Sequence, residues 1–133
     1  MPHHSRMINS KDRSKILIVD DEKEMVGYLS EYFVSRGYRV YAAVDGSEAL
    51  RKVETLNPDV VLLDLLMPGI HGMEVLTRIK SSHPRTAVVI MTALINETVA
   101  EEALEAGADA YIAKPFNLEK IETLIRSVID RYR

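Results

Sequence analysis

Short apolar runs alternate along the chain with segments whose apolar residues recur at helical spacing. Continuous apolar runs bounded by turn residues are typical of strands that are covered on both faces of a sheet. Such runs predict strands over residues 16–19, 38–42, 60–63, 87–91 and 111–113. Apolar residues three and four positions apart predict a helix after each strand, giving five helices. This alternation of strand and helix predicts an α/β domain with a parallel sheet.

The ends of the predicted helices carry residues that favour helix boundaries. The first helix, over residues 24–36, ends at Gly37, a residue typical of helix C-termini. Asp45 and Glu48 form a capping box that begins the second helix, and Asn57-Pro58 ends it. The other helices are predicted after a loop over residues 65–72, over 96–106, and after the N-cap residue Asn117.

The second predicted strand differs from the others because the charged Arg39 interrupts its apolar pattern. We therefore place this strand at an edge of the sheet. Right-handed crossovers then favour a doubly wound, five-stranded parallel sheet with strand order 2-1-3-4-5, the flavodoxin-like order. Ligands of such sheets bind beyond the carboxyl ends of the strands where the order reverses, which is here between the first and third strands.

Acidic residues and one lysine follow three of the predicted strands, at the carboxyl ends where a ligand would bind. Asp20 and Asp21 come directly after the first strand, Asp64 after the third and Lys114 after the fifth. Carboxylates that share one cleft repel each other unless a cation joins them, and oxygen ligands suit magnesium. A lysine beside them can neutralise a phosphoryl group. The pattern predicts a magnesium-assisted phosphoryl-accepting site with Asp64 as the nucleophile.

Composition narrows the class of protein further. The 133 residues suit one domain, which we place at residues 15–133 after a disordered polar tail over 1–14. A net charge of −3 predicts no strong attraction to nucleic acid or membrane. The absence of cysteine excludes disulfides and thiolate metal sites and fits the cytoplasm. No apolar stretch approaches the roughly 20 residues that span a bilayer.

Four motifs together resemble a known family. They are Asp20-Asp21, the segment DLLMPGIHG over residues 64–72, Thr92-Ala93, and Lys114-Pro115-Phe116. In this order and spacing they resemble the receiver domain of two-component response regulators, across residues 15–131. Each motif alone would be a weak signal, whereas the series is specific.

The resemblance implies a role for each matching acidic residue. Asp64 would accept the phosphoryl group from a phosphohistidine on a sensor histidine kinase or phosphotransfer protein. Mg²⁺ would be bound by Asp21, Asp64 and the backbone carbonyl of Leu66, while Asp20 would act through a metal-bound water. The domain would catalyse only its own phosphorylation and dephosphorylation, so it is expected to signal rather than to act as an enzyme.

The resemblance also implies how the signal leaves the site. Thr92 and Lys114 would contact the phosphoryl group, and Lys114 would pair with Asp64 beforehand. The Lys114-Pro115 peptide bond is expected to be cis, which aims Lys114 into the cleft. Phosphorylation would draw in Thr92 and let the ring of Tyr111 turn inward as a switch. The surface that responds would be formed by the fourth helix, the fifth strand and the fifth helix.

The sequence leaves open which partner would bind that surface. The fourth predicted helix carries only acidic charges, at Glu97, Glu101, Glu102 and Glu105. A phosphorylation-dependent dimer would therefore need a basic contribution from Lys120 and Arg126 on the fifth helix. No nucleic-acid-binding segment follows that helix, so we expect no direct nucleic acid binding by this chain. The output domain or target protein is not identified by the sequence.

Two other functions fit the sequence less well than a signalling domain. A haloacid-dehalogenase-type phosphatase uses the pattern D-x-D-x-T, but Leu65 and Leu66 follow Asp64 and no second Asp is available as general acid. A flavodoxin-like FMN binder needs a Gly/Ser/Thr-rich loop after the first strand. The segment DDEKE that begins at Asp20 would instead repel a phosphate. Both alternatives are disfavoured.

The lifetime of an aspartyl phosphate is a further expectation. In receiver domains, the side chains two positions after the phosphoacceptor and two after the threonine flank the path of the attacking water. These positions are Leu66 and Leu94. Leucine cannot orient water and its bulk can exclude it, so we expect slow hydrolysis.

Overall fold

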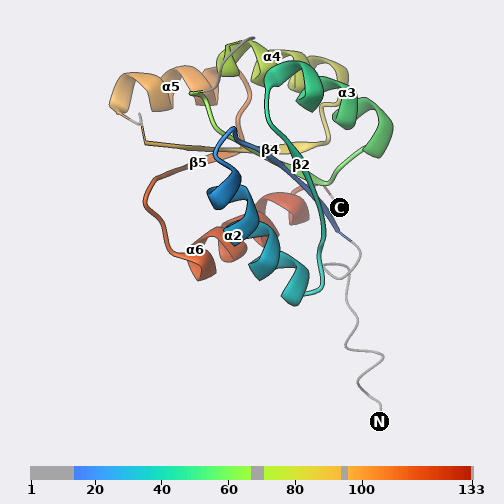
Figure 1. Ribbon diagram of the computed structural model, residues 1–133. Helices are drawn as coiled ribbons and strands as arrows, with labels where there is room; N and C mark the ends of the chain where they lie inside the picture. The colour runs from blue at the N-terminus through green and yellow to red at the C-terminus, as the bar shows by residue number, and fades with distance from the viewer. Residues whose placement is uncertain (1–13, 67–70, 94–95, 133) are drawn as a thin grey trace.

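Strands and helices alternate from β1 to α6 in the computed structural model, which describes residues 14–66, 71–93 and 96–132. Apart from Ser14, the tail predicted over residues 1–14 lies outside the described residues. The elements are β1 (Lys15–Val19), α2 (Lys23–Ser35), β2 (Arg39–Ala43), α3 (Gly46–Leu56), β3 (Val60–Leu63), α4 (Gly72–Ser82), β4 (Ala87–Thr92), α5 (Glu97–Glu105), β5 (Ala110–Ala113) and α6 (Leu118–Asp130) (Figure 1). The predicted strands and helices are therefore present.

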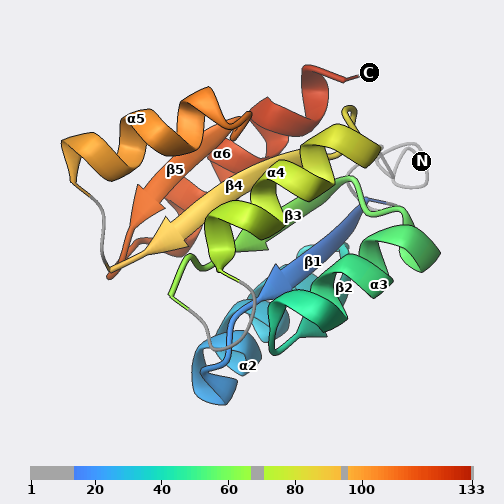
Figure 2. The same cartoon turned by 90° about the horizontal axis from the view of Figure 1, so that it is seen from above.

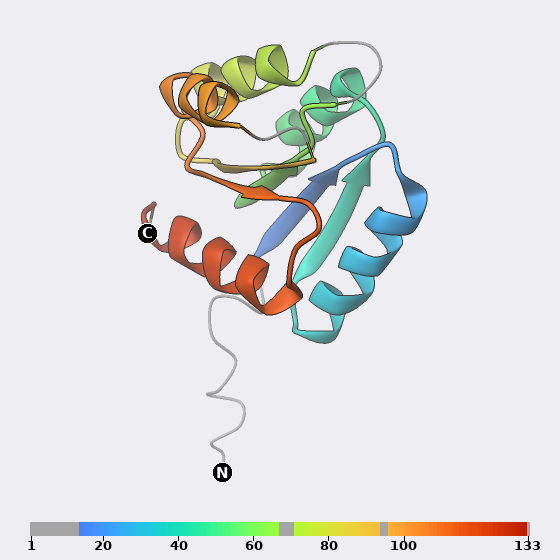
Figure 3. The same ribbon diagram turned by 90° about the vertical axis from the view of Figure 1, so that its left-hand side faces the viewer.

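The strands form one parallel sheet in the order β2-β1-β3-β4-β5, which confirms the predicted topology. Helices α3, α4 and α5 cover one face, and α2 and α6 cover the other (Figures 1 and 3). The carboxyl ends of the strands lie along a single edge (Figure 2). Arg39 is exposed on the outer strand β2, as its charge predicted. In the part of the chain that the structure describes, no helix is long and apolar enough to span a membrane.

Two hydrophobic cores lie on opposite faces of the sheet, because side chains alternate along each strand. On β1, Leu17 and Val19 join the core beneath α3, α4 and α5, whereas Ile16 and Ile18 join the core against α2 and α6. Every residue of β3 and β4 is buried. The central strands are thus held from both sides, which fixes the positions of the residues that follow them.

Side chains cap most of the helices at their N-termini. In α3, Asp45 Oδ1 accepts a hydrogen bond from the Glu48 amide at 2.8 Å, and Glu48 Oε1 accepts one from the Val44 amide at 2.8 Å. The predicted capping box therefore forms, with its return bond one residue earlier than expected. His71, Asn96 and Asn117 cap α4, α5 and α6. Among the described residues, only the N-cap residue of α2 contributes no side-chain cap.

A buried polar group joins α2 to α6. Glu122 on α6 is 4% exposed, and its Oε1 accepts hydrogen bonds from Tyr32 Oη at 2.9 Å and Arg36 Nε at 3.0 Å. Nearby Tyr38 is also 4% exposed, and its hydroxyl has no hydrogen-bond partner within the residues described. Burial raises the pKa of Tyr38 to about 12, with the negative charge of Glu122 as a further cause. The buried Glu122 carboxylate is therefore satisfied by hydrogen bonds, whereas the buried Tyr38 hydroxyl is not satisfied by any described residue.

Candidate functional site

Asp20, Asp64 and Lys114 meet at the carboxyl edge of the sheet, although they are far apart in the sequence. Asp20 follows β1, Asp64 follows β3 and Lys114 follows β5. The sheet ladder continues into both aspartates: the Asp20 amide donates to Ala43 O at 3.1 Å and the Asp64 amide to Val19 O at 3.0 Å. The two carboxylates are consequently carried by backbone that belongs to the rigid sheet.

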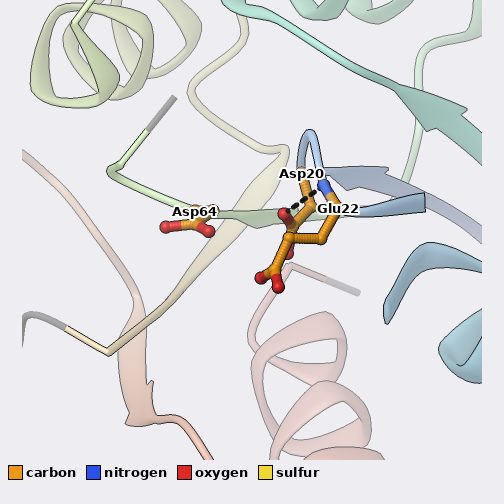
Figure 4. A group of neighbouring side chains, drawn as sticks. All are labelled: Asp20, Glu22 and Asp64. Carbon is orange, nitrogen blue, oxygen red and sulfur yellow. Dashed lines mark hydrogen bonds between the residues drawn. The ribbon is translucent and has the colours of Figure 1, made fainter. Parts of the chain in front are cut away.

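Each aspartate is also oriented by an amide of the loop that follows it. Asp20 Oδ1 accepts a hydrogen bond from the Glu22 amide at 3.0 Å (Figure 4), and Asp64 Oδ1 accepts one from the Leu66 amide at 2.9 Å. Asp side chains close such turns with the backbone two residues on. One oxygen of each carboxylate is thereby fixed, and the second oxygen of each contacts Lys114 Nζ.

The Lys114 ammonium lies among three carboxylates. Its Nζ is 2.8 Å from Asp20 Oδ2, 2.9 Å from Asp64 Oδ2 and 3.0 Å from Glu22 Oε1. Burial alone lowers the pKa of Lys114, but the hydrogen bonds to Asp20, Asp64 and Glu22 outweigh it and raise the pKa above the usual value. The lysine therefore stays charged. The expected pair with Asp64 is present, and the Lys114-Pro115 bond is cis, as predicted.

Carboxylate oxygens of Asp20, Glu22 and Asp64 all lie within 4.8 Å of one another, and we call these residues the acidic cluster (Figure 4). Closely spaced, negatively charged oxygen donors fit a hard divalent cation such as Mg²⁺. Among described residues, Asp21 is not part of this cluster, and it is exposed. The sequence reasoning did not select Glu22, although it is the third acid of the same DDE segment.

The remaining predicted residues that the structure describes differ in exposure. Thr92 ends β4 and is fully buried, and its carbonyl accepts a hydrogen bond from the Lys114 amide at 3.1 Å. Tyr111 on the edge strand β5 is 43% exposed. Leu66 is 50% exposed, whereas Leu94 lies outside the described residues. Thr92 and Lys114 are thus linked through the backbone, while Tyr111 faces solvent.

The fold matches that of a solved protein. The chain resembles the crystal structure of a CheY-like response regulator receiver domain protein from Methanospirillum hungatei, with a TM-score of 0.86 and 29% sequence identity. The match covers 90% of this chain and 95% of that one. The likeness therefore extends over nearly the whole of both chains.

Curated relatives fall into two kinds. The chain is 38% identical over 115 residues to sporulation initiation phosphotransferase F of Bacillus subtilis, covering 86% of this chain and 93% of the relative. It is 37% identical over 116 residues to the regulatory protein AtoC of Escherichia coli, covering 87% of this chain. The chain spans only 25% of the length of AtoC. Relatives thus include a protein of similar length and a much longer one.

A family model adds a match that is independent of any single relative. The model of the response regulator receiver domain matches residues 16–126, which include the acidic cluster, Thr92 and Lys114. Receiver domains of this family are signalling modules that bind Mg²⁺ at an acidic cluster and interact with histidine kinases or phosphotransfer proteins. The chain belongs to the family of response regulator receiver domains.

Proposed function

We propose that this receiver domain accepts a phosphoryl group on Asp64 from the phosphohistidine of a sensor histidine kinase or phosphotransfer protein. One observation carries the proposal: Asp64 Oδ1 is held by the Leu66 amide while Oδ2 faces Lys114 Nζ at 2.9 Å. A carboxylate held in this way is oriented toward an incoming group, and the lysine offsets the charge that this group brings.

The transfer is a simple substitution at phosphorus. An Asp64 carboxylate oxygen forms the new P–O bond, and the P–N bond to the donor imidazole breaks. The electron pair of that bond stays on the imidazole nitrogen, which takes up a proton from solvent. Lys114 reduces the repulsion between the acidic cluster and the phosphoryl oxygens, and the Thr92 hydroxyl donates a hydrogen bond to one of them. The domain thus catalyses its own phosphorylation. Its dephosphorylation is a separate step, in which water attacks the phosphorus, the P–O bond to Asp64 breaks, and inorganic phosphate leaves while Asp64 returns to a carboxylate.

Magnesium is the proposed cofactor. Asp64, Asp21 and the carbonyl of Leu66 would hold it, and Asp20 would contribute through a water molecule. When bound, Mg²⁺ supplies positive charge that neutralises the transferring oxygens. The close spacing of the carboxylates of Asp20, Glu22 and Asp64 supports this role, because negatively charged oxygen donors grouped in this way attract a hard divalent cation.

The surface formed by α5, β5 and α6 is proposed to transmit the signal. Tyr111 is exposed on β5, so an inward turn of its ring would change this surface. Thr92 would move toward the phosphoryl group and make room for that turn, a two-state change driven by a local charge. An output domain, a target protein or a second receiver domain would read the change. Addition of beryllofluoride should shift the amide signals of α5, β5 and α6 more than those of α3.

Intact mass spectrometry tests the central step. Incubation with acetyl phosphate and Mg²⁺ should add one phosphoryl group to the wild type, and chelation of the metal should prevent it. Asp64→Asn should abolish labelling because an amide is a poor nucleophile. The control Asp130→Asn removes an exposed carboxylate at the end of α6 and should be labelled normally. Equal labelling of Asp64→Asn at another residue would overturn the assignment.

A further inference from the structure

Glu22 occupies the N-cap position of α2 but does not use its side chain as a cap. The N-cap residues of the other helices, Asp45, His71, Asn96 and Asn117, each accept a hydrogen bond from a backbone amide. The Glu22 carboxylate instead reaches Lys114 Nζ at 3.0 Å, across 92 positions of sequence. The acid at the start of α2 therefore contacts Lys114 and not the helix backbone.

The carboxylates around Lys114 are held to different degrees. The side chains of Asp20 and Asp64 are 0% and 6% exposed, and a backbone amide fixes one oxygen of each. The side chain of Glu22 is 63% exposed. Glu22 can consequently follow the ammonium when it moves, whereas the two aspartates stay in place.

Two cations compete for the same carboxylates in this cleft. Asp20 Oδ2 and Asp64 Oδ2 hold the Lys114 ammonium, and in the proposed function the same two carboxylates serve the divalent cation, Asp64 as a ligand and Asp20 through a metal-bound water. An ammonium and a divalent cation weaken each other's binding to the same carboxylates because their charges repel. Lys114 therefore needs another anion once Asp20 and Asp64 are engaged, and among described residues Glu22 is the third carboxylate in contact with its Nζ.

We propose that Glu22 is a positioning residue that receives the Lys114 ammonium when Asp20 and Asp64 turn to a divalent cation. This inference rests on the proposed function, in which Mg²⁺ binds at the acidic cluster. Glu22 keeps the ammonium at the mouth of the cleft, where it can meet the phosphoryl oxygens. It also weakens the competition between Lys114 and the metal, so it promotes metal binding without being a ligand.

A double-mutant cycle on magnesium affinity tests this role, because such a cycle isolates the coupling between two residues. The Kd for Mg²⁺ is measured by NMR titration of the Leu66 amide signal. The proteins are wild type, Glu22→Gln, Lys114→Met and the double variant. Glu24→Gln, which neutralises an exposed acid in the first turn of α2, controls for net charge. Amide spectra of the metal-free variants verify that each one is folded.

We expect Glu22→Gln to raise the Kd by roughly three- to tenfold when Lys114 is present, a size typical of coupled neighbours. The same substitution should change the Kd by less than about twofold in the Lys114→Met background, because no ammonium then competes. Glu24→Gln should have little effect in either background. The Lys114 Nζ signal should also differ between metal-loaded wild type and metal-loaded Glu22→Gln.

Each other outcome overturns the inference in a recognisable way. An equal rise in Kd in both backgrounds would make Glu22 a direct metal ligand. No change in either background would remove Glu22 from the site altogether. A wild type that binds no Mg²⁺ would overturn the proposed function, and the role of Glu22 with it. Phosphorylation of Asp64 with an additive cycle would leave the function intact and refute only the role of Glu22.

Discussion

Gly72, the first residue of α4, packs directly against the backbone of Leu65. A Cβ atom at Gly72 would lie 2.6 Å from Leu65 Cα and 2.9 Å from Leu65 O, closer than atoms can approach. Leu65 follows the proposed phosphoacceptor Asp64, so this contact braces the start of the loop against a helix. This position requires glycine because there is no room for a Cβ atom between the two backbones.

Gly72→Ala should therefore disturb both stability and chemistry. The added methyl group meets backbone, which cannot rotate away, so we expect a loss of about 1–3 kcal/mol in the free energy of unfolding. Displacement of Leu65 would also shift the Leu66 amide that orients Asp64, so labelling by acetyl phosphate should slow. Urea denaturation and a labelling time course measure the two effects. Wild-type values in both would show that the loop adapts freely.

Gly27→Ala is the opposite case. Gly27 lies in the middle of α2, is exposed, and a Cβ there would meet no atom of the described residues within 4 Å. Alanine loses less backbone entropy than glycine in a helix, so the variant should gain about 0.5–1 kcal/mol in unfolding free energy. Urea denaturation measures the gain. A destabilised variant would show that the absence of a side chain at Gly27 is itself needed for stability.

Tyr38→Phe should stabilise the protein at neutral pH. The buried Tyr38 hydroxyl has no partner among described residues, and a buried polar group without a hydrogen bond costs free energy. Its removal leaves the ring packed in an edge-to-face contact with Phe33. We expect a gain of about 1 kcal/mol in unfolding free energy. A loss of that size would mean that the hydroxyl is satisfied in solution.

The advantage of Tyr38→Phe should grow at alkaline pH. The folded protein raises the pKa of Tyr38 from 10.0 to about 12, so the unfolded chain releases this proton at a lower pH than the folded protein does. The contribution of Tyr38 to the free energy of unfolding is therefore constant below pH 10 and falls as the pH rises toward 12. Phenylalanine does not ionise, so the difference between variant and wild type should widen across this interval by roughly 2–3 kcal/mol. Urea titrations of both proteins in the same buffers cancel the contributions of other groups. A constant difference would contradict the raised pKa.

Leu66→Asn should shorten the lifetime of the aspartyl phosphate. The Leu66 side chain is half exposed beside Asp64, where a polar group can orient the attacking water. We expect hydrolysis to accelerate by about tenfold, which corresponds to about 1.4 kcal/mol of barrier. A phosphate-release time course measures the rate. Leu104→Asn replaces a similarly exposed leucine on α5 and should leave it unchanged; equal rates in all three proteins would exclude Leu66 as the brake.

The sheet could be predicted from the sequence because its strands are covered on both faces. β3 reads as an unbroken apolar run, and the interruption at Arg39 marks β2 as an edge. Residues at strand ends, such as Asp64 and Lys114, follow from the same logic, since parallel strands bring their carboxyl ends together. The fourth strand was predicted to end at residue 91 but ends at Thr92, because its hydrogen-bonded ladder continues one residue past the apolar run.

Partners in other elements could not be predicted in the same way. Glu22 lies beyond the strand and reads as a helix-start residue, and its contact depends on the reach of Lys114 from the other side of the sheet. Glu122 reads as part of a solvated helix face, yet it is buried because Tyr32 and Arg36 satisfy it from α2. The position of each of these charged side chains depends on a contact between two segments that are far apart in the sequence. A local sequence pattern does not show such a contact.

The missing side-chain cap of α2 has a consequence for local opening. The first amides of a helix lack intrahelical partners, and a helix without a capping side chain starts from a less secure turn. Fraying at Lys23 and Glu24 should therefore be the least costly rearrangement near the cleft, and amide exchange there should be faster than at the start of α3, which Asp45 caps. The first turn of α2, next to Glu22, can therefore unfold locally while the hydrogen bonds of the sheet that holds Asp20 and Asp64 remain intact.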